Sequence, residues 1–155
     1  MNQESRHQQS KSFIEFENYQ VNESIFMLNQ DFLEPEESIQ LKTRFSIKHD
    51  YKSPEEVCVT IVCELFEADM VSINAPFYLK INMSGWFLLT EDPQDEQKRQ
   101  TLHANTVAIL FPYLRSAVTT LTSVANMNGL PPVILPPVNT YALLEQQSKE
   151  KNNAD

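Results

Sequence analysis

Histidine and cysteine are the side chains of this sequence that could most readily supply acid–base, thiol or metal chemistry. Its three histidines, His7, His49 and His103, are scattered, and no two have the i, i+4 spacing that places a pair of zinc ligands on one helix. His49 precedes Asp50 where we expect a strand to run into a turn. No local catalytic signature is present, and a group assembled from distant residues would leave none.

Cys58 and Cys63 lie five residues apart in a predicted strand, so their side chains should point to opposite faces of a sheet. At about 3.3 Å per residue they are roughly 16 Å apart, which is beyond the reach of a disulfide. Two free thiols are typical of a protein in a reducing cytosol. The alternative, half of a metal site, requires further ligands at suitable spacing, and none adjoin the pair.

Composition excludes several other classes of function. The only glycines are Gly85 and Gly129, so the sequence lacks the Gly-rich loops that bind phosphates and dinucleotides, and we expect no cofactor. The formal net charge of -9 argues against a nucleic-acid partner, because such binding depends on clustered Lys and Arg. We therefore expect a non-catalytic protein.

The chain of 155 residues is most simply one domain. We predict a disordered N-terminal arm over residues 1–12, a single domain over residues 13–147 and a disordered tail over residues 148–155. No apolar core of signal-peptide length follows Met1, and no window is expected to span a membrane. These features predict a cytoplasmic protein without membrane insertion.

Period-two alternation predicts four strands, over residues 13–28, 39–48, 57–66 and 77–90. In the first strand Glu23 interrupts a row of apolar residues of one parity, which are Tyr19, Val21, Ile25 and Met27. Gly85 within the last strand indicates either a bulge, which would reverse the parity after it, or a close approach of another element. Because the connections are short, we expect consecutive strands to pair as an antiparallel meander.

The period changes after Asp92, where apolar residues recur every three or four positions, as on an amphipathic helix: Val107, Leu110, Leu114, Val118, Leu121 and Ala125. Pro93 favours a helix start, while Asn105 could equally cap a second helix. Pro112 lies inside the run and predicts a bend, and Gly129 suits the position just after the helix end. We expect a short final helix over residues 140–147.

The long helix carries more apolar residues than one face of a small sheet can cover, because Ile109, Tyr113 and Val124 lie off the main stripe. It could fill a groove of its own domain or be shared with a second subunit. Beyond it, residues 130–138 hold four prolines and five aliphatic residues, which predicts a stiff, extended segment. This segment is either a connector for the final helix or one wall of an apolar groove for extended peptide.

Together these elements predict an α+β fold with a four-stranded antiparallel sheet, one long bent helix and a short C-terminal helix. The sequence ILFPYLR at residues 109–115, followed by PPVN at residues 136–139, resembles the C-terminal half of the SecB family of protein-export chaperones. Gly85, Trp86 and Phe87 add support, and the resemblance extends over about residues 41–144.

The resemblance implies an ATP-independent holdase that assembles as a dimer of dimers and binds unfolded preproteins in apolar grooves. Carried over by position, the client-binding groove would include aromatic and aliphatic residues, namely Phe77, Tyr78, Trp86, Phe87, Leu130, Val133, Ile134 and Leu135. The oligomer interface would include residues of the long helix, namely Phe111, Pro112, Tyr113, Leu114 and Val118.

The outer face of the sheet departs from the family pattern. The family uses acidic residues there to dock the translocation motor SecA, and Lys80 occupies a position that matches one of them. Lys42, Arg44 and Lys48 make another part of that face basic, so docking of SecA would be altered or absent. Two alternatives stay open: a SecB-like chaperone dedicated to an antitoxin or another single partner, and a non-catalytic scaffold module.

Overall fold

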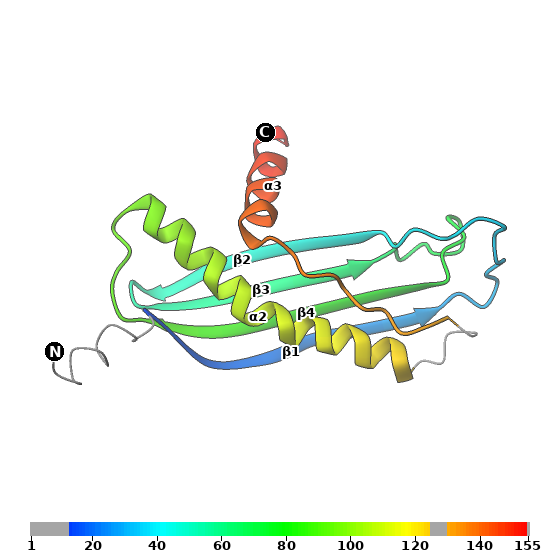
Figure 1. The fold of residues 1–155 in the computed structure, drawn as a ribbon, viewed down its shortest axis with the longest axis horizontal. Helices are drawn as coiled ribbons and strands as arrows, with labels where there is room; N and C mark the ends of the chain where they lie inside the picture. The colour runs from blue at the N-terminus through cyan, green and yellow to red at the C-terminus, as the bar shows by residue number, and fades with distance from the viewer. Residues whose placement is uncertain (1–12, 125–129, 155) are drawn as a thin grey trace, which may run out of the picture.

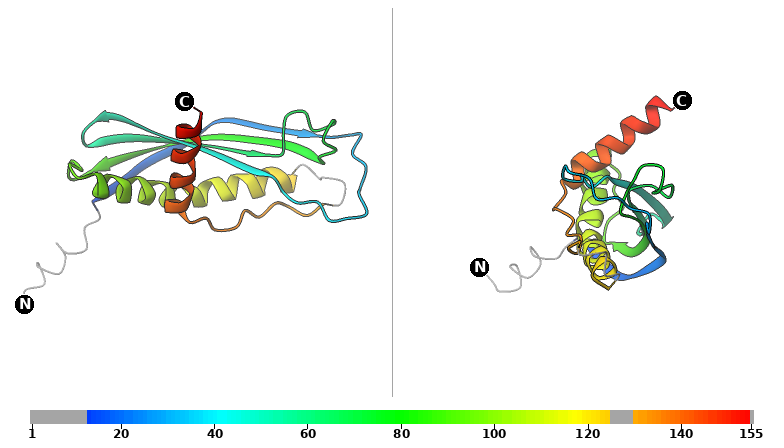
Figure 2. Two further views of the ribbon diagram at one scale, coloured as in Figure 1. Left: turned by 90° about the horizontal axis from the view of Figure 1, so that it is seen from above. Right: turned by 90° about the vertical axis from the view of Figure 1, so that its right-hand side faces the viewer.

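Four strands and two helices make up the computed structural model, which describes residues 13–124 and 130–154. In chain order they are β1 (Ile14–Leu28), β2 (Thr43–Ser53), β3 (Glu56–Leu65), β4 (Phe77–Leu89), α2 (Glu96–Val124) and α3 (Thr140–Asn153). The strands form one antiparallel sheet, and α2 lies along one of its faces (Figure 1, Figure 2). The predicted α+β class is confirmed. The arm expected over residues 1–12, and the helix positions Ala125 and Gly129, lie outside the described residues.

The order of the strands differs from a simple four-stranded meander. β2, β3 and β4 do pair consecutively, but β1 pairs with β4, which gives the order β1-β4-β3-β2. Residues 29–42 carry the chain from one edge of the sheet to the other (Figure 1). Asn29 holds the start of this connection, since its Nδ2 donates to the Ala75 carbonyl at 2.8 Å and its backbone N–H donates to the Pro76 carbonyl at 3.0 Å. The connection is therefore a crossover and not a turn between neighbouring strands.

β2 is displaced toward the C-terminus relative to the strand predicted over residues 39–48. Its partner β3 ends at Leu65, and the Phe66 N–H donates to the Lys42 carbonyl at 2.9 Å, so the alternating residues before β2 lie beyond the end of β3. At its other end β2 continues through His49 and Asp50. The turn expected directly after Asp50 is therefore wrong.

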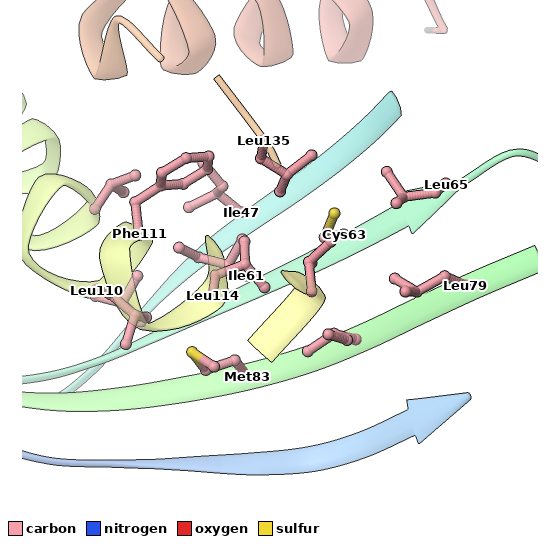
Figure 3. Close-up of a cluster of buried hydrophobic side chains, with 14 of the residues drawn as sticks. Ile47, Ile61, Cys63, Leu65, Leu79, Met83, Leu110, Phe111, Leu114 and Leu135 are labelled. Carbon is pink, nitrogen blue, oxygen red and sulfur yellow. The ribbon is translucent and has the colours of Figure 1, made fainter. Parts of the chain in front are cut away.

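Alternate residues of β3 and β4 face α2 and form the inner face of the sheet. The buried ones are Val57, Val59, Ile61, Cys63, Leu65, Phe77, Leu79, Ile81, Met83, Phe87 and Leu89. α2 packs Leu110, Phe111, Leu114 and Val118 into the same core (Figure 3). Cys58 points to the opposite, outer face, and both cysteines are free thiols as predicted. Burial raises the pKa of the Cys63 thiol to about 12.

Gly85 marks a close approach of α2 to the sheet. A Cβ atom on this residue would lie 3.0 Å from Leu110 Cδ1 and 3.1 Å from Phe87 Cε2. The pairing of β3 with β4 runs through Gly85 without a register shift, and burial continues to alternate beyond it. The predicted close approach is therefore confirmed, whereas a bulge with reversed parity is not formed.

α2 is one continuous helix, so the second helix that Asn105 could have capped is not formed. Asp95 caps its start, because Asp95 Oδ1 accepts the Gln97 N–H at 3.0 Å. Pro112 lies in mid-helix on the solvent side, and the axis of α2 changes direction near its middle (Figure 1). The long bent helix of the prediction is therefore present.

The length and composition of α2 correct one expectation, because this helix could cross a membrane by those two criteria alone. The apolar core helix of a soluble protein passes the same test, and the buried side of α2 packs on the sheet. On its other sides, Tyr113 is 39 % exposed and Val124 is 80 % exposed. α2 therefore has more apolar surface than its own sheet covers.

α3 extends to Asn153, beyond the predicted end at Gln147, so most of the tail expected over residues 148–155 is helical. The residues after Gln147 are polar and exposed and carry no apolar period that would have predicted a helix. Asn139 caps α3 through its Oδ1, which accepts the Ala142 N–H at 3.1 Å. The helix stands away from the sheet beyond β2 (Figure 1, Figure 2).

Two histidines that are distant in sequence stack between β2 and α2. The ring centroids of His49 and His103 are 3.8 Å apart. His49 Nε2 lies 3.0 Å from Thr106 Oγ1, and the Tyr51 hydroxyl lies 2.8 Å from His103 Nε2. Burial, and then the charge of His103, lowers the pKa of His49 to about 3, and burial also lowers the pKa of His103. The contact therefore favours two neutral rings.

The stacked histidines predict a loss of stability in mild acid. Because the pKa of His49 is lower in the folded chain than its ordinary value of 6.5, protons bind preferentially to the unfolded chain as the pH falls below 6.5. His49→Gln keeps a hydrogen-bonding side chain that does not titrate. The drop in unfolding free energy between about pH 7.5 and pH 5, measured with urea, should be about 1–2 kcal/mol smaller in this variant. Equal drops in both proteins would show that His49 does not cause the loss of stability in acid.

The contact of Gly85 with Leu110 predicts coupled effects of mutation. Gly85→Val should destabilise the chain by about 1–3 kcal/mol, because the added methyl groups overpack the core. Leu110→Ala alone should cost about 2–5 kcal/mol through the cavity it leaves. The double variant should lose clearly less than the sum, because the smaller side chain makes room for the larger one. Urea unfolding of all four proteins measures the coupling, and simple additivity would refute the contact.

Candidate functional site

A groove lies between β1 and the second half of α2, and we call it the β1–α2 groove. Its volume is about 420 Å³. It is lined mainly by apolar and small side chains, which are Tyr19, Val21, Ser24, Met83, Tyr113, Ser116, Ala117, Thr120, Leu121 and Val124. Val21 is 45 % exposed and Val124 is 80 % exposed. The groove therefore presents to solvent apolar side chains that the fold of one chain does not cover.

Tyr113 joins this groove to the core through a series of aromatic contacts. Its ring centroid lies 4.4 Å from that of Tyr19 and 5.6 Å from that of Phe16, and Phe16 lies 5.2 Å from Phe87 in the core. Aromatic pairs at these separations attract each other beyond the effect of buried area. Because Tyr113 and Tyr19 are both partly exposed, the same cluster that anchors β1 to α2 also forms one wall of the groove.

β1 presents its groove residues because its register with β4 shifts twice. One shift follows Phe16 and the other follows Val21, and each inserts a residue that reverses the alternation of side chains. Tyr19 and Val21 therefore face α2, whereas Ile25 faces away although it shares their parity in the sequence. Periodicity within β1 does not predict the groove for this reason, and the charged Glu23 in the apolar row is the signal that marks the second shift.

The Pro-rich segment, residues 130–138, runs along the side of α2 away from β1 (Figure 1). Arg115 Nε donates to the Leu135 carbonyl at 2.8 Å, and Thr119 Oγ1 donates to the Val133 carbonyl at 2.8 Å. Leu135 is buried in the core. The segment is therefore fixed to α2 by side chains of the helix, as expected for a connector, and it remains extended.

The residues predicted to bind client lie in three places. Those in the core are Phe77, Phe87 and Leu135. Those on the outer face of the sheet are Tyr78 and Trp86. Those along the Pro-rich segment are Leu130, Val133 and Ile134, and Ile134 is 74 % exposed. Alternation along β4 sends Tyr78 and Trp86 to the face opposite α2, so the structure does not bring the eight residues into one groove.

The residues predicted for the oligomer interface divide between the core and the surface. Phe111, Leu114 and Val118 are buried against the sheet of the same chain, whereas Pro112 and Tyr113 are exposed. The exposed pair continues along the solvent side of α2 with small residues, and we call this surface the α2 ridge: Pro112, Tyr113, Ser116 and Thr120. The ridge overlaps the β1–α2 groove, because Tyr113, Ser116 and Thr120 also line the groove.

The outer face of the sheet pairs its charges across neighbouring strands. Lys80 Nζ lies 2.8 Å from Glu23 Oε1, and Arg44 lies 3.0 Å from Glu64 Oε2. The Tyr78 hydroxyl donates to Glu64 at 2.9 Å. Burial acts to raise the pKa of Glu64, but the hydrogen bonds from Tyr78 and Arg44 and the nearby positive charges lower it overall. Lys48 Nζ also lies 3.3 Å from Asp50 Oδ2, so Lys80, Arg44 and Lys48 each have an acidic partner on this face.

A second opening, of about 540 Å³, lies between the start of β1 and the start of α2. Its rim includes Glu91, Asp92, Asp95 and Lys98. Within residues 13–124 and 130–154, no three His, Cys, Asp or Glu side chains are placed to hold a metal ion. In that same part of the chain, no buried side-chain donor or acceptor lacks a partner. Among the residues that the structure describes, no charged side chain lines the β1–α2 groove, so it is the stronger candidate for binding an apolar ligand.

Known proteins resemble the chain over most of its length. The family model described as preprotein translocase subunit SecB matches residues 11–151. An uncharacterized protein of Methanocaldococcus jannaschii is 34 % identical over 145 residues, which are 92 % of this chain and 90 % of that protein. The protein-export protein SecB of Nitrosomonas eutropha is 33 % identical over 124 residues, which are 78 % of this chain and 72 % of that protein.

A solved structure shares the fold at low sequence identity. It is a SecB-like chaperone of Mycobacterium tuberculosis in complex with a peptide from an antitoxin. The match covers 86 % of this chain and 95 % of the chain in that structure. The TM-score is 0.62 and the sequence identity is 17 %. The family model, the curated relatives and the fold all agree with the resemblance found in the sequence. The chain belongs to the SecB family of protein-export chaperones.

Proposed function

We propose that the protein is an ATP-independent holdase that binds unfolded polypeptides in the β1–α2 groove. The β1–α2 groove itself carries the proposal, because it leaves apolar side chains of both β1 and α2 open to solvent. Unfolded chains also expose apolar side chains, and covering both surfaces gains roughly 25 cal/mol per Å² of apolar area. The protein would act in the cytoplasm by binding without catalysis.

We further propose a dimer of dimers in which the α2 ridges of two copies meet. Ser116 and Thr120 are small enough to allow two helices to approach closely, and Tyr113 supplies the aromatic contact that interfaces favour. The exposure of the Tyr113 ring within one chain supports this role. Of the five residues first assigned to the interface, Pro112 and Tyr113 would make direct contact, while Phe111, Leu114 and Val118 would support them from the core.

Such an assembly would carry apolar walls on both sides of each ridge. Contact between two ridges would cover Tyr113, Ser116 and Thr120 at one edge of the β1–α2 groove and leave Val21 and Val124 open to a client. The Pro-rich segment lies on the other side of the ridge with Leu130, Val133 and Ile134. A long client could then occupy several grooves of one oligomer, which raises its affinity without requiring a specific sequence. Ordering the client offsets part of this gain, so short segments should bind weakly.

Preproteins are the first candidate clients, since curated relatives are named for protein export. A dedicated client is the second candidate, and the bound antitoxin peptide of the Mycobacterium tuberculosis chaperone supports it. The pairing of Lys80 with Glu23 also supports altered docking of SecA, because a neutralised position cannot serve as an acidic contact. A scaffold that binds one folded partner is the third candidate, and it would leave unfolded clients to aggregate.

A charge placed in the groove tests the holdase activity. We expect Val21→Glu to bind an unfolded client at least about tenfold more weakly, because the carboxylate would be buried without a partner at a cost of about 1–3 kcal/mol or more. Gln20→Glu adds the same charge to the opposite face of β1 and is the matched control. The readout is turbidity when guanidine-unfolded citrate synthase is diluted into buffer without ATP. Equal protection by the two variants would exclude the groove, and aggregation with the wild type would exclude a holdase.

A charge on the α2 ridge tests the assembly. Tyr113→Asp should reduce the mass of the particle measured by light scattering, because two ridges cannot bury unpaired carboxylates against each other. Tyr141→Asp makes the same change on α3, where Tyr141 is 53 % exposed, and should leave the mass unchanged. Thermal unfolding of both variants checks that the chain still folds. An unchanged mass in folded Tyr113→Asp would remove the ridge from the interface.

A further inference from the structure

The edge strand β2 has a side chain bound where a neighbouring strand would lie. β2 is the last strand of the sheet on its side. The Ile47 N–H donates to Gln147 Oε1 at 3.1 Å, and Gln147 Nε2 donates to the Phe45 carbonyl at 3.0 Å. The side-chain amide therefore offers one acceptor and one donor to the strand, which are the groups that a residue of an added strand would offer. Gln147 therefore makes the two hydrogen bonds that one residue of an added fifth strand would make.

α3 holds Gln147 in this position with little other support. No residue of α3 is buried, although Leu143 and Leu144 pack at the margin of the core. The helix stands away from the sheet beyond β2 (Figure 1, Figure 2). Moving the second half of α3 would therefore uncover little apolar surface, and it would free the backbone groups of Phe45 and Ile47.

A cavity that could accept one side chain of an added strand lies beside this contact. This cavity of about 320 Å³ lies between α3 and the strands β2 and β3, and its lining includes Val62 as well as the ion pair of Arg44 with Glu64. A strand that joins a sheet edge points alternate side chains to the two faces of the sheet. The cavity could accept such a side chain on the outer face, where it would meet an apolar residue and two charges.

We propose that the free edge of β2 binds the backbone of an extended client segment as an added strand, and that Gln147 occupies this edge when no client is bound. Binding by strand addition takes its affinity from main-chain hydrogen bonds and is therefore tolerant of sequence. Coverage by Gln147 also protects an open edge from pairing with other copies of the chain. This inference rests on the proposed holdase function and adds a second contact surface to the β1–α2 groove.

The test removes the amide and keeps the length of the side chain. In Gln147→Met, client binding no longer competes with the two hydrogen bonds, so we expect carboxymethylated α-lactalbumin, which stays unfolded, to bind about threefold to tenfold more tightly. The Ile47 amide should exchange faster in the free variant than in the wild type and become protected when the client is added. Gln146→Met alters the exposed neighbouring residue of α3 and should behave as the wild type in both measurements.

Two results would overturn the inference, and they separate it from the proposed function. If Gln147→Met binds the client no more tightly than the wild type, Gln147 does not compete for the edge. If the Ile47 amide exchanges equally fast in the free and client-bound variant, no strand is added at β2. In both cases client binding by the wild type would still support the holdase through the β1–α2 groove. Failure of the wild type to bind the unfolded protein would instead reject the holdase, and this inference with it.

Discussion

The packing of α2 against the inner face of the sheet is the constraint on which the rest of the structure depends. Gly85 allows Leu110 to approach β4 closely, and Leu114 and Val118 continue the same buried side of the helix. Because only one side of α2 packs on the sheet, burying that side determines which residues its other sides expose. One side holds the Pro-rich segment and another forms the β1–α2 groove, and the α2 ridge, which overlaps the groove, faces solvent. The surfaces proposed for client and assembly are consequences of this single contact.

The extent to which the sequence predicts this structure depends on the element. β3 and β4 are central strands with one fully buried face, and their alternation predicts their bounds and their buried residues closely. β1 lies at an edge, where two register shifts place Tyr19 and Ile25 on opposite faces despite their common parity. Register shifts and strand order are set by pairing between distant segments, and periodicity within one segment carries little information about them. The long helix and its bend were predictable from the sequence, whereas the groove beside β1 was not.

Prediction of the candidate site residues from the sequence meets the same limit. Core and groove use the same side chains, so aromatic and aliphatic types alone could not separate Phe87, which is buried, from Tyr19, which is open to solvent. The stacked histidines were also missed, since His49 and His103 meet only through the packing of β2 against α2. The resemblance to SecB predicted the family and the general role. Only the fold shows which apolar residues remain on the surface to perform it.

Site-specific photo-cross-linking reports directly where on the protein a client lies. A photoreactive residue replaces Val124 in the β1–α2 groove or, in a matched protein, Leu88 on the outer face of the sheet, and each is irradiated with an unfolded client. If the β1–α2 groove binds the client, cross-links to the client should form from position 124 and few should form from position 88. Cross-links from position 88 alone, or equal yields from both positions, would contradict binding in this groove.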